Sequence, residues 1–85
     1  MSEDARLTDF VLLVDRLESR TSGYLTLDAV RATCGPLRDL VERAVADYVL
    51  LVDHRTHLDP NTREATTVTV CRLNRHHPLV RRLSQ

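Results

Sequence analysis

The sequence predicts an α+β fold in a single domain over residues 1–85: a three-helix core, a C-terminal two-stranded β-hairpin and a short amphipathic C-terminal segment. Two observations predict this order. Apolar residues recur with helical spacing as far as Tyr48, and two runs rich in Val, Leu and Thr then flank a strong turn sequence. The length of 85 residues is enough for one modest hydrophobic core.

A first helix is expected from Ser2, whose hydroxyl can cap its start, to the segment 19–23 that ends in Gly23. Its apolar stripe consists of Leu7, Phe10, Val11, Val14 and Leu17. Leu12 and Leu13 widen this stripe beyond what one packing partner needs. Two interpretations follow. Either the third helix and the C-terminal segment wrap the first helix, or a homodimer forms along a seam of Phe10, Leu12 and Leu13.

Two short helices joined by a Gly-Pro turn are predicted next. Tyr24 and Leu25 form a brief extended stretch, and Thr26 is a good N-cap for a helix over residues 27–33. Gly35 ends that helix, and Pro36 suits the first position of the third helix because its missing N–H is not needed there. The third helix is expected to bury Leu37, Leu40, Val41, Ala44, Val45 and Tyr48. It is expected to expose Arg38, Asp39, Glu42, Arg43, Ala46 and Asp47.

The hairpin is predicted from residues 49–58 and 64–73, which are separated by the turn sequence Asp-Pro-Asn-Thr at 59–62. If Asp59 faces Thr62, Val52 lies opposite Thr69 and Leu50 opposite Cys71, and a bulge near the turn would shift this register. Pro78 then opens a short helical turn. Its apolar side carries Leu79, Val80 and Leu83, and its other side carries Arg81 and Arg82.

Charge is divided unevenly along the chain. Residues 1–53 carry six Arg and ten acidic residues, a net charge of −4, whereas residues 54–85 carry six Arg, two acidic residues and all four His, a net of +4. A molecule with one basic end is typical of proteins that bind a polyanion. The sequence therefore predicts a binding protein whose hairpin and C-terminal segment form the basic end.

The segment from Leu25 to Leu73 resembles the winged helix-turn-helix domains of prokaryotic transcription regulators of the MarR and ArsR type. The matching features are residues 25–30 opening the second helix, Gly35 in the turn, Val41 and Val45 inside the third helix, and the strand-turn-strand after it. The exit from the hairpin, residues 73–80, also looks like such a domain. Two features depart from the pattern: the neighbourhood between the third helix and the first hairpin strand, where a Gly is usual, reads Asp-Tyr-Val at 47–49, and the exposed face of the third helix carries three acidic residues against two Arg.

The resemblance implies a non-catalytic protein that binds double-stranded DNA, a transcriptional regulator acting as a homodimer. The two distant cysteines, which make no disulfide framework, indicate the reducing cytoplasm as its location. The third helix would enter the major groove and the hairpin would reach the minor groove or the backbone. The expected DNA-binding residues are Arg38, Arg43, Arg55, His57, Arg63, Arg72, Arg75, Arg81 and Arg82.

A second interpretation is a winged-helix module that binds another protein and no nucleic acid. The acidic residues of the third helix favour it, because carboxylates near phosphate are repelled unless they are paired. Arg38–Glu42 and Asp39–Arg43 are expected to form such i, i+4 pairs. The partner would then be a protein with a basic surface.

Metal, cofactor and enzyme chemistry are not predicted. His54 and His57 are three apart in a strand and point to opposite faces, and His76 and His77 are adjacent, so neither pair has the spacing of a zinc site. The sequence contains no Gly-rich phosphate loop and no nucleophile motif. The two cysteines are too few for a disulfide framework, and the longest apolar run inside the domain, residues 48–52, is too short to span a bilayer.

Overall fold

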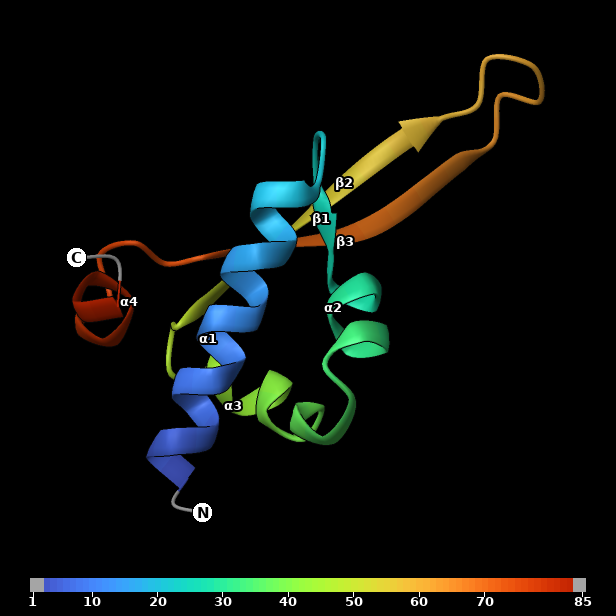
Figure 1. Ribbon diagram of the computed structural model, residues 1–85. Helices are drawn as coiled ribbons and strands as arrows, with labels where there is room; N and C mark the ends of the chain where they lie inside the picture. Colours follow the sequence, from blue (N-terminus) through green and yellow to red (C-terminus); the bar gives the residue numbers. More distant parts are fainter. Residues whose placement is uncertain (1–2, 84–85) are drawn as a thin grey trace.

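A computed structural model describes residues 3–83 and has an α+β architecture with a three-stranded antiparallel sheet. The helices are α1 (Glu3–Arg20), α2 (Leu27–Thr33), α3 (Leu40–Ala46) and α4 (Pro78–Leu83), with a 3₁₀ turn, η1, at Gly35–Leu37. The strands are β1 (Leu25–Thr26), β2 (Leu50–Leu58) and β3 (Ala65–Leu73), in the order β1-β3-β2. This arrangement is compatible with a winged-helix fold. Figure 1 shows the helices gathered around one end of the sheet, from which the β2–β3 hairpin projects.

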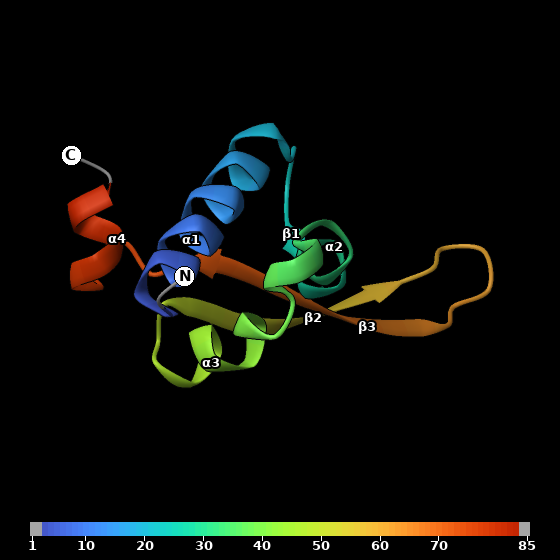
Figure 2. The same cartoon turned by 60° about the horizontal axis from the view of Figure 1, so that its bottom comes forward.

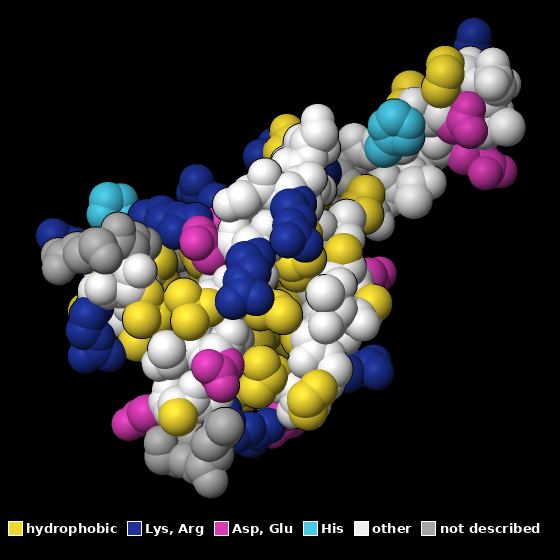
Figure 3. Space-filling model, in the orientation of Figure 1, with side chains coloured by type: hydrophobic (Ala, Val, Ile, Leu, Met, Phe, Trp, Pro, Cys, Tyr) yellow, Lys and Arg dark blue, Asp and Glu magenta, His cyan; other side chains and the backbone are white. Residues whose placement is uncertain are grey.

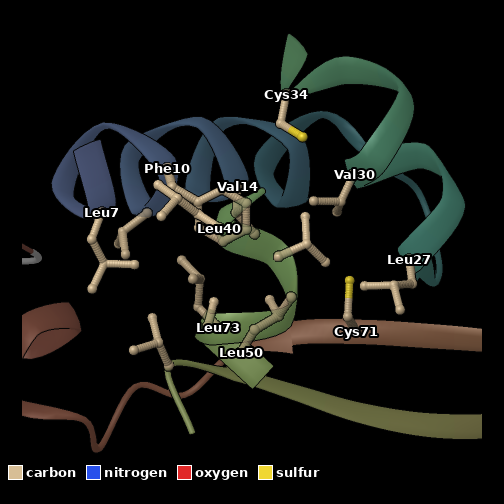
Figure 4. Packing of buried hydrophobic residues seen from close by; sticks show 14 of the residues in the cluster. Leu7, Phe10, Val14, Leu27, Val30, Cys34, Leu40, Leu50, Cys71 and Leu73 are labelled. Atoms are coloured by element: carbon tan, nitrogen blue, oxygen red, sulfur yellow. The ribbon is translucent and has the colours of Figure 1, made fainter. Parts of the chain in front are cut away.

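The hydrophobic core lies between α1, α2, α3 and one face of the sheet (Figure 4). The predicted stripe of α1 is confirmed, because Leu7, Phe10, Val11 and Val14 are buried and Leu17 packs against the same cluster. Leu13 also packs there, which favours the interpretation that α1 is wrapped by its own chain. The predicted cap at Ser2 lies outside the described residues.

The second helix begins and ends as predicted, at Leu27 and Thr33. The hydroxyl oxygen of Thr26 accepts a hydrogen bond from the backbone N–H of Ala29 at 3.1 Å, which satisfies one of the free donors at the helix start. Toward the end of α2, Val30 is fully buried, and Cys34, directly after the helix, is also buried. The α4 prediction is also confirmed, since Val80 is buried while Arg81 and Arg82 are exposed.

The third helix is shorter than predicted. Hydrogen bonds from Leu37 N–H to Cys34 O and from Arg38 N–H to Gly35 O, 3.0 and 3.1 Å, have the i, i+3 spacing of a 3₁₀ turn. The α-helix therefore starts at Leu40, and Pro36 opens the 3₁₀ turn instead. Arg38 and Asp39 thus lie in the corner before α3 and not on the helix itself.

Tyr48 was expected to be buried, and this prediction is wrong: its side chain is 69% exposed. Its φ of 59° ends α3 in the left-handed conformation, with Tyr48 N–H bonded to Val45 O (3.2 Å) and Val49 N–H to Ala44 O (2.9 Å). These two bonds define a Schellman motif, in which this position usually carries Gly. The side-chain amide of Asn74 donates to Tyr48 O at 2.9 Å and holds the carbonyl in place.

Replacing Tyr48 by Gly is therefore expected to stabilise the protein by about 0.5–1 kcal/mol. A left-handed conformation costs an L-residue roughly 1–2 kcal/mol, and only part of this gain is lost to the greater freedom of Gly in the unfolded chain. Urea unfolding measures the difference. Tyr48→Ala is the control, because Ala retains the strain; a Gly variant no more stable than the Ala variant would contradict the explanation.

The hairpin register differs from the prediction by two residues: Leu50 lies opposite Leu73, and Val52 opposite Cys71. The reason is a connection of six residues, 59–64, closed by a hydrogen bond from Asp59 N–H to Glu64 O at 3.0 Å. The Asp59 carboxylate accepts from Asn61 N–H at 2.8 Å, and Arg63 turns the chain with a φ of 60°. A shift of two leaves every side chain on its predicted face, because side chains alternate with a period of two.

The half of the hairpin that lies farther from the core, residues 53–67, is exposed on both faces. Figures 1 and 2 show it extending away from the helices, and the longest dimension of the molecule is 48 Å. This exposed part of the hairpin has no packing partner among the described residues except where Arg55 reaches back to Tyr24.

Candidate nucleic-acid interface

The positive charge of the second half of the chain is concentrated in a short segment. Residues 70–83 contain four Arg and no acidic residue, whereas the hairpin residues 48–69 contain two Arg and three acidic residues. The α2–α3 region, residues 27–47, contains three Arg and four acidic residues. The formal charge therefore places the basic end at the end of β3 and in α4, and not in the remainder of the hairpin, residues 48–69.

On the α3 side, Arg43 forms ion pairs with Glu3 and with Asp47, the latter at 3.4 Å. Asp39 accepts a hydrogen bond from Arg6 at 2.6 Å, and this bond lowers the pKa of the Asp39 carboxyl. The predicted pair Asp39–Arg43 is therefore wrong, because Asp39 binds Arg6 of α1 and Arg43 binds Glu3 of α1 and Asp47 at the end of α3. The predicted pair Arg38–Glu42 is also wrong, because no ion pair joins these two residues of the described chain. Arg38 is exposed, and within residues 3–83 it has no ion pair.

In the hairpin, Arg55 lies 3.4 Å from Asp53 and 5.0 Å from the centroid of the Tyr24 ring, in cation–π geometry. His57 is exposed in β2. Arg63 is exposed in the connecting loop, and in the described part of the chain nothing pairs with its charge. Of the two arginines in residues 48–69, Arg63 at the tip is therefore unpaired within the described residues and Arg55 is held against Tyr24 and Asp53.

At the end of β3, Arg75 binds two carboxylates of α1, Asp15 at 2.8 Å and Glu18 at 2.6 Å. The hydrogen bond that Arg75 donates to the Asp15 carboxylate is the main cause that raises the pKa of Arg75. Its charge is thus compensated within the fold. Arg72, Arg81 and Arg82 are exposed and have no ion pair within residues 3–83.

The nine predicted DNA-binding residues do not converge on one surface. The hairpin tip and α4 lie at opposite ends of the molecule in both ribbon views, and α4 lies beside α1 (Figures 1 and 2). Uncharged side chains cover most of the hairpin surface seen in Figure 3. The expected face that joins the hairpin to the C-terminal segment is therefore absent among the described residues.

The predicted dimer seam on α1 is also corrected. Phe10 is completely buried in the core of its own chain, so it has no surface to offer a second copy. Leu13 is covered by the same core, and Leu12 is 37% exposed. Around Leu12 the outer side of α1 carries the charged residues Asp9 and Arg16. The apolar part of this surface is small.

Two features of the structure, a contact made by Glu18 and a groove beside Tyr24, were not anticipated from the sequence. The carboxylate of Glu18 accepts the backbone N–H of Leu73 at 2.7 Å with one oxygen and binds Arg75 with the other. Tyr24, 64% exposed, lines with Leu51, Arg55 and Arg72 a groove of about 700 Å³ against the uncovered face of the sheet. The sequence carries no signal for the first contact, because 55 residues separate its partners.

The cysteines and histidines form no metal cluster in the described residues: no group of three or more His, Cys, Asp and Glu side chains could hold an ion. Cys34 and Cys71 are both buried. Burial raises the pKa of the Cys34 thiol and raises that of Cys71 to about 11, so both are protonated near neutral pH. A thiol in this state is a poor nucleophile.

None of the helices within residues 3–83 has both the length and the apolar character needed to cross a membrane. Comparison with protein-family models, with curated proteins and with solved structures finds no match for this chain.

Proposed function

We propose that this chain is a non-catalytic DNA-binding protein with a winged-helix fold, and that it regulates transcription. The observation that supports this most is the projecting β2–β3 hairpin, whose outer part, residues 53–67, has both faces uncovered and an arginine, Arg63, at its tip without an ion pair in residues 3–83. A two-stranded ribbon of this kind fits into a groove of DNA, and its arginine can bind backbone phosphates. The element order, with β1 between α1 and α2, is that expected of a winged helix.

The contact to DNA would be made mainly with phosphates. Arg38, in the corner before α3, and Arg63, at the hairpin tip, are both exposed and lack acidic partners in residues 3–83, so both guanidinium groups are available. Arg43 is held by Glu3 and Asp47, which limits its use for reading bases. Phosphate contacts position a protein without reading sequence, so the binding would be weakly sequence-selective and strongly salt-dependent.

The test is a polarisation titration with random duplex DNA at low and moderate salt. Arg63→Ala and Arg38→Ala should each weaken binding several-fold, whatever the DNA sequence, and each should reduce the slope of log K against log salt by about one. Arg16→Ala is the matched control, because Arg16 is exposed on α1 and belongs neither to the hairpin nor to the α3 corner. It should leave both the affinity and the slope unchanged.

Arg82→Ala separates two modes of docking. If the hairpin binds DNA, this variant should behave as Arg16→Ala does, because α4 and the hairpin tip lie at opposite ends of the molecule (Figure 1). If Arg82→Ala weakens binding while Arg63→Ala does not, the basic segment 70–83 is the contact and the hairpin is not. Absence of binding even at low salt would contradict the proposed function.

The second candidate is a module that binds another protein. The observation that favours it is the excess of acidic residues in both regions of the proposed interface, residues 27–47 and 48–69. The exposed apolar side chains of Tyr24, Tyr48 and Leu58 add surface that a protein partner could cover. A chain that does not bind duplex DNA at low salt would favour this candidate.

A further inference from the structure

One edge of strand β3 is open along half of its length. β2 pairs with all nine residues of β3, but β1 pairs only with Val70 and Cys71 on the other side. From Ala65 to Thr69, no strand among residues 3–83 lies against that side. The side chains of residues 65–67 are exposed and those of 68 and 69 are half-buried. In an antiparallel pair every second residue turns its N–H and C=O outward, so this edge presents unpaired backbone donors and acceptors.

The composition of this edge contrasts with that of the other open edge. Residues 65–71, Ala-Thr-Thr-Val-Thr-Val-Cys, contain no charge, no Pro and no Gly, and Thr and Val strongly favour β structure. Strand β2, whose outer edge is also open, carries Asp53, His54, Arg55 and His57. Charged side chains are a common way in which proteins prevent edge-to-edge pairing. The β2 edge is protected in this way and the β3 edge is not.

The sequence of the β3 edge is complementary to itself. An antiparallel pairing centred on Thr67 places Thr67 of one copy opposite Thr67 of another, Thr66 opposite Val68, and Ala65 opposite Thr69. These cross-strand pairs bring no like charges together, and Thr–Thr and Thr–Val pairs are favourable in sheets. An antiparallel pairing of two copies of β2, centred on Arg55, would place two guanidinium groups opposite each other.

We propose that two copies of this chain pair through the β3 edge, residues 65–69, and form a symmetric dimer in which the two sheets join edge to edge, with the order β2-β3-β3-β2 across the seam. The two helical bodies then lie at opposite ends of the joined hairpins, because each hairpin projects from its own body (Figure 1). The dimer buries the unpaired backbone groups of the edge and needs no contact from α1. It does not depend on DNA binding, and it can be tested without DNA.

Sedimentation equilibrium between about 1 μM and about 1 mM protein should show a monomer–dimer equilibrium for the wild type. The triple variant Ala65→Lys, Thr67→Lys, Thr69→Lys places like charges opposite one another in the dimer and should weaken it at least about tenfold. The matched control is Leu58→Lys, Thr56→Lys, His54→Lys. Its three positions lie directly opposite the first three, on the same face of the sheet but in β2. The control should dimerise as the wild type does.

Crosslinking through one added cysteine gives a second measurement if the triple variants fold poorly. Thr67→Cys should form an interchain disulfide with oxidised glutathione, and Thr56→Cys, directly across the hairpin, should not. The two native cysteines are buried and do not interfere. A wild type that stays monomeric over the whole concentration range would overturn the proposal, as would equal weakening by both triple variants or equal crosslinking at positions 56 and 67.

Discussion

Replacing Phe10 by Ala is expected to destabilise the protein by about 3–5 kcal/mol, the largest effect of any single substitution considered. Phe10 is completely buried and is the only Phe of the chain. It lies beside Val14 and Leu40 in the core between α1 and α3 (Figure 4). An ordinary domain has a total stability of about 5–15 kcal/mol, so this variant should be partly unfolded at ambient temperature.

Urea unfolding followed by circular dichroism measures this loss. Leu12→Ala is the control on the same helix, because the Leu12 side chain is 37% exposed and should lose less than about 1 kcal/mol. A Phe10→Ala protein that keeps the stability of the wild type but no longer self-associates would show that Phe10 lies at a subunit interface. That result would contradict the burial described above.

Replacing Glu18 by Ala is expected to cost about 2–3 kcal/mol. The Glu18 side chain is 20% exposed and joins α1 to the end of β3 through the Leu73 N–H and the Arg75 guanidinium. Leu73 is buried, so its N–H would lose its partner in a place that water reaches poorly. A buried donor left without a partner costs about 1–3 kcal/mol, and the lost contact with Arg75 adds to this.

Asp15→Ala is the matched control for Glu18→Ala. Asp15 binds the same Arg75 at 2.8 Å, but its side chain is 49% exposed and in the described chain it makes no bond to the strand. An exposed ion pair contributes roughly 0–1 kcal/mol, so the control should be far less destabilised. Hydrogen exchange of the Leu73 amide should accelerate in the Glu18 variant alone. Equal losses for the two variants would mean that the ion pair, and not the backbone bond, gives the stability.

The helices could be predicted from local pattern because each depends on nearby residues. The stripe from Leu7 to Leu17 and the cap at Thr26 are local features, and both have the predicted roles. The start of α3 could not be placed, because Pro36 is compatible with either an α-helix or a 3₁₀ turn. The hairpin register depends on the left-handed conformation of Arg63, which no residue preference at that position indicates.

The candidate site was less predictable than the fold, for a physical reason. Charge along the sequence located the basic segment, but whether an arginine is available depends on contacts between distant residues. Arg43 and Arg75 are occupied by carboxylates of α1, which lies far from both in the sequence. Within the hairpin, the negative charges of Asp59 and Glu64 offset the positive charges of Arg55 and Arg63, and this balance is visible in the sequence.

The exposed part of the hairpin has a consequence for how this protein can change. Between residues 53 and 67 the hairpin adds reach but hardly any buried surface, so residues can be inserted or deleted there in pairs with little effect on the folding of the helical body. The length of the hairpin can therefore change without a change in the stability of the rest of the molecule. Hairpins of different lengths would then suit different targets while the core residues stay the same.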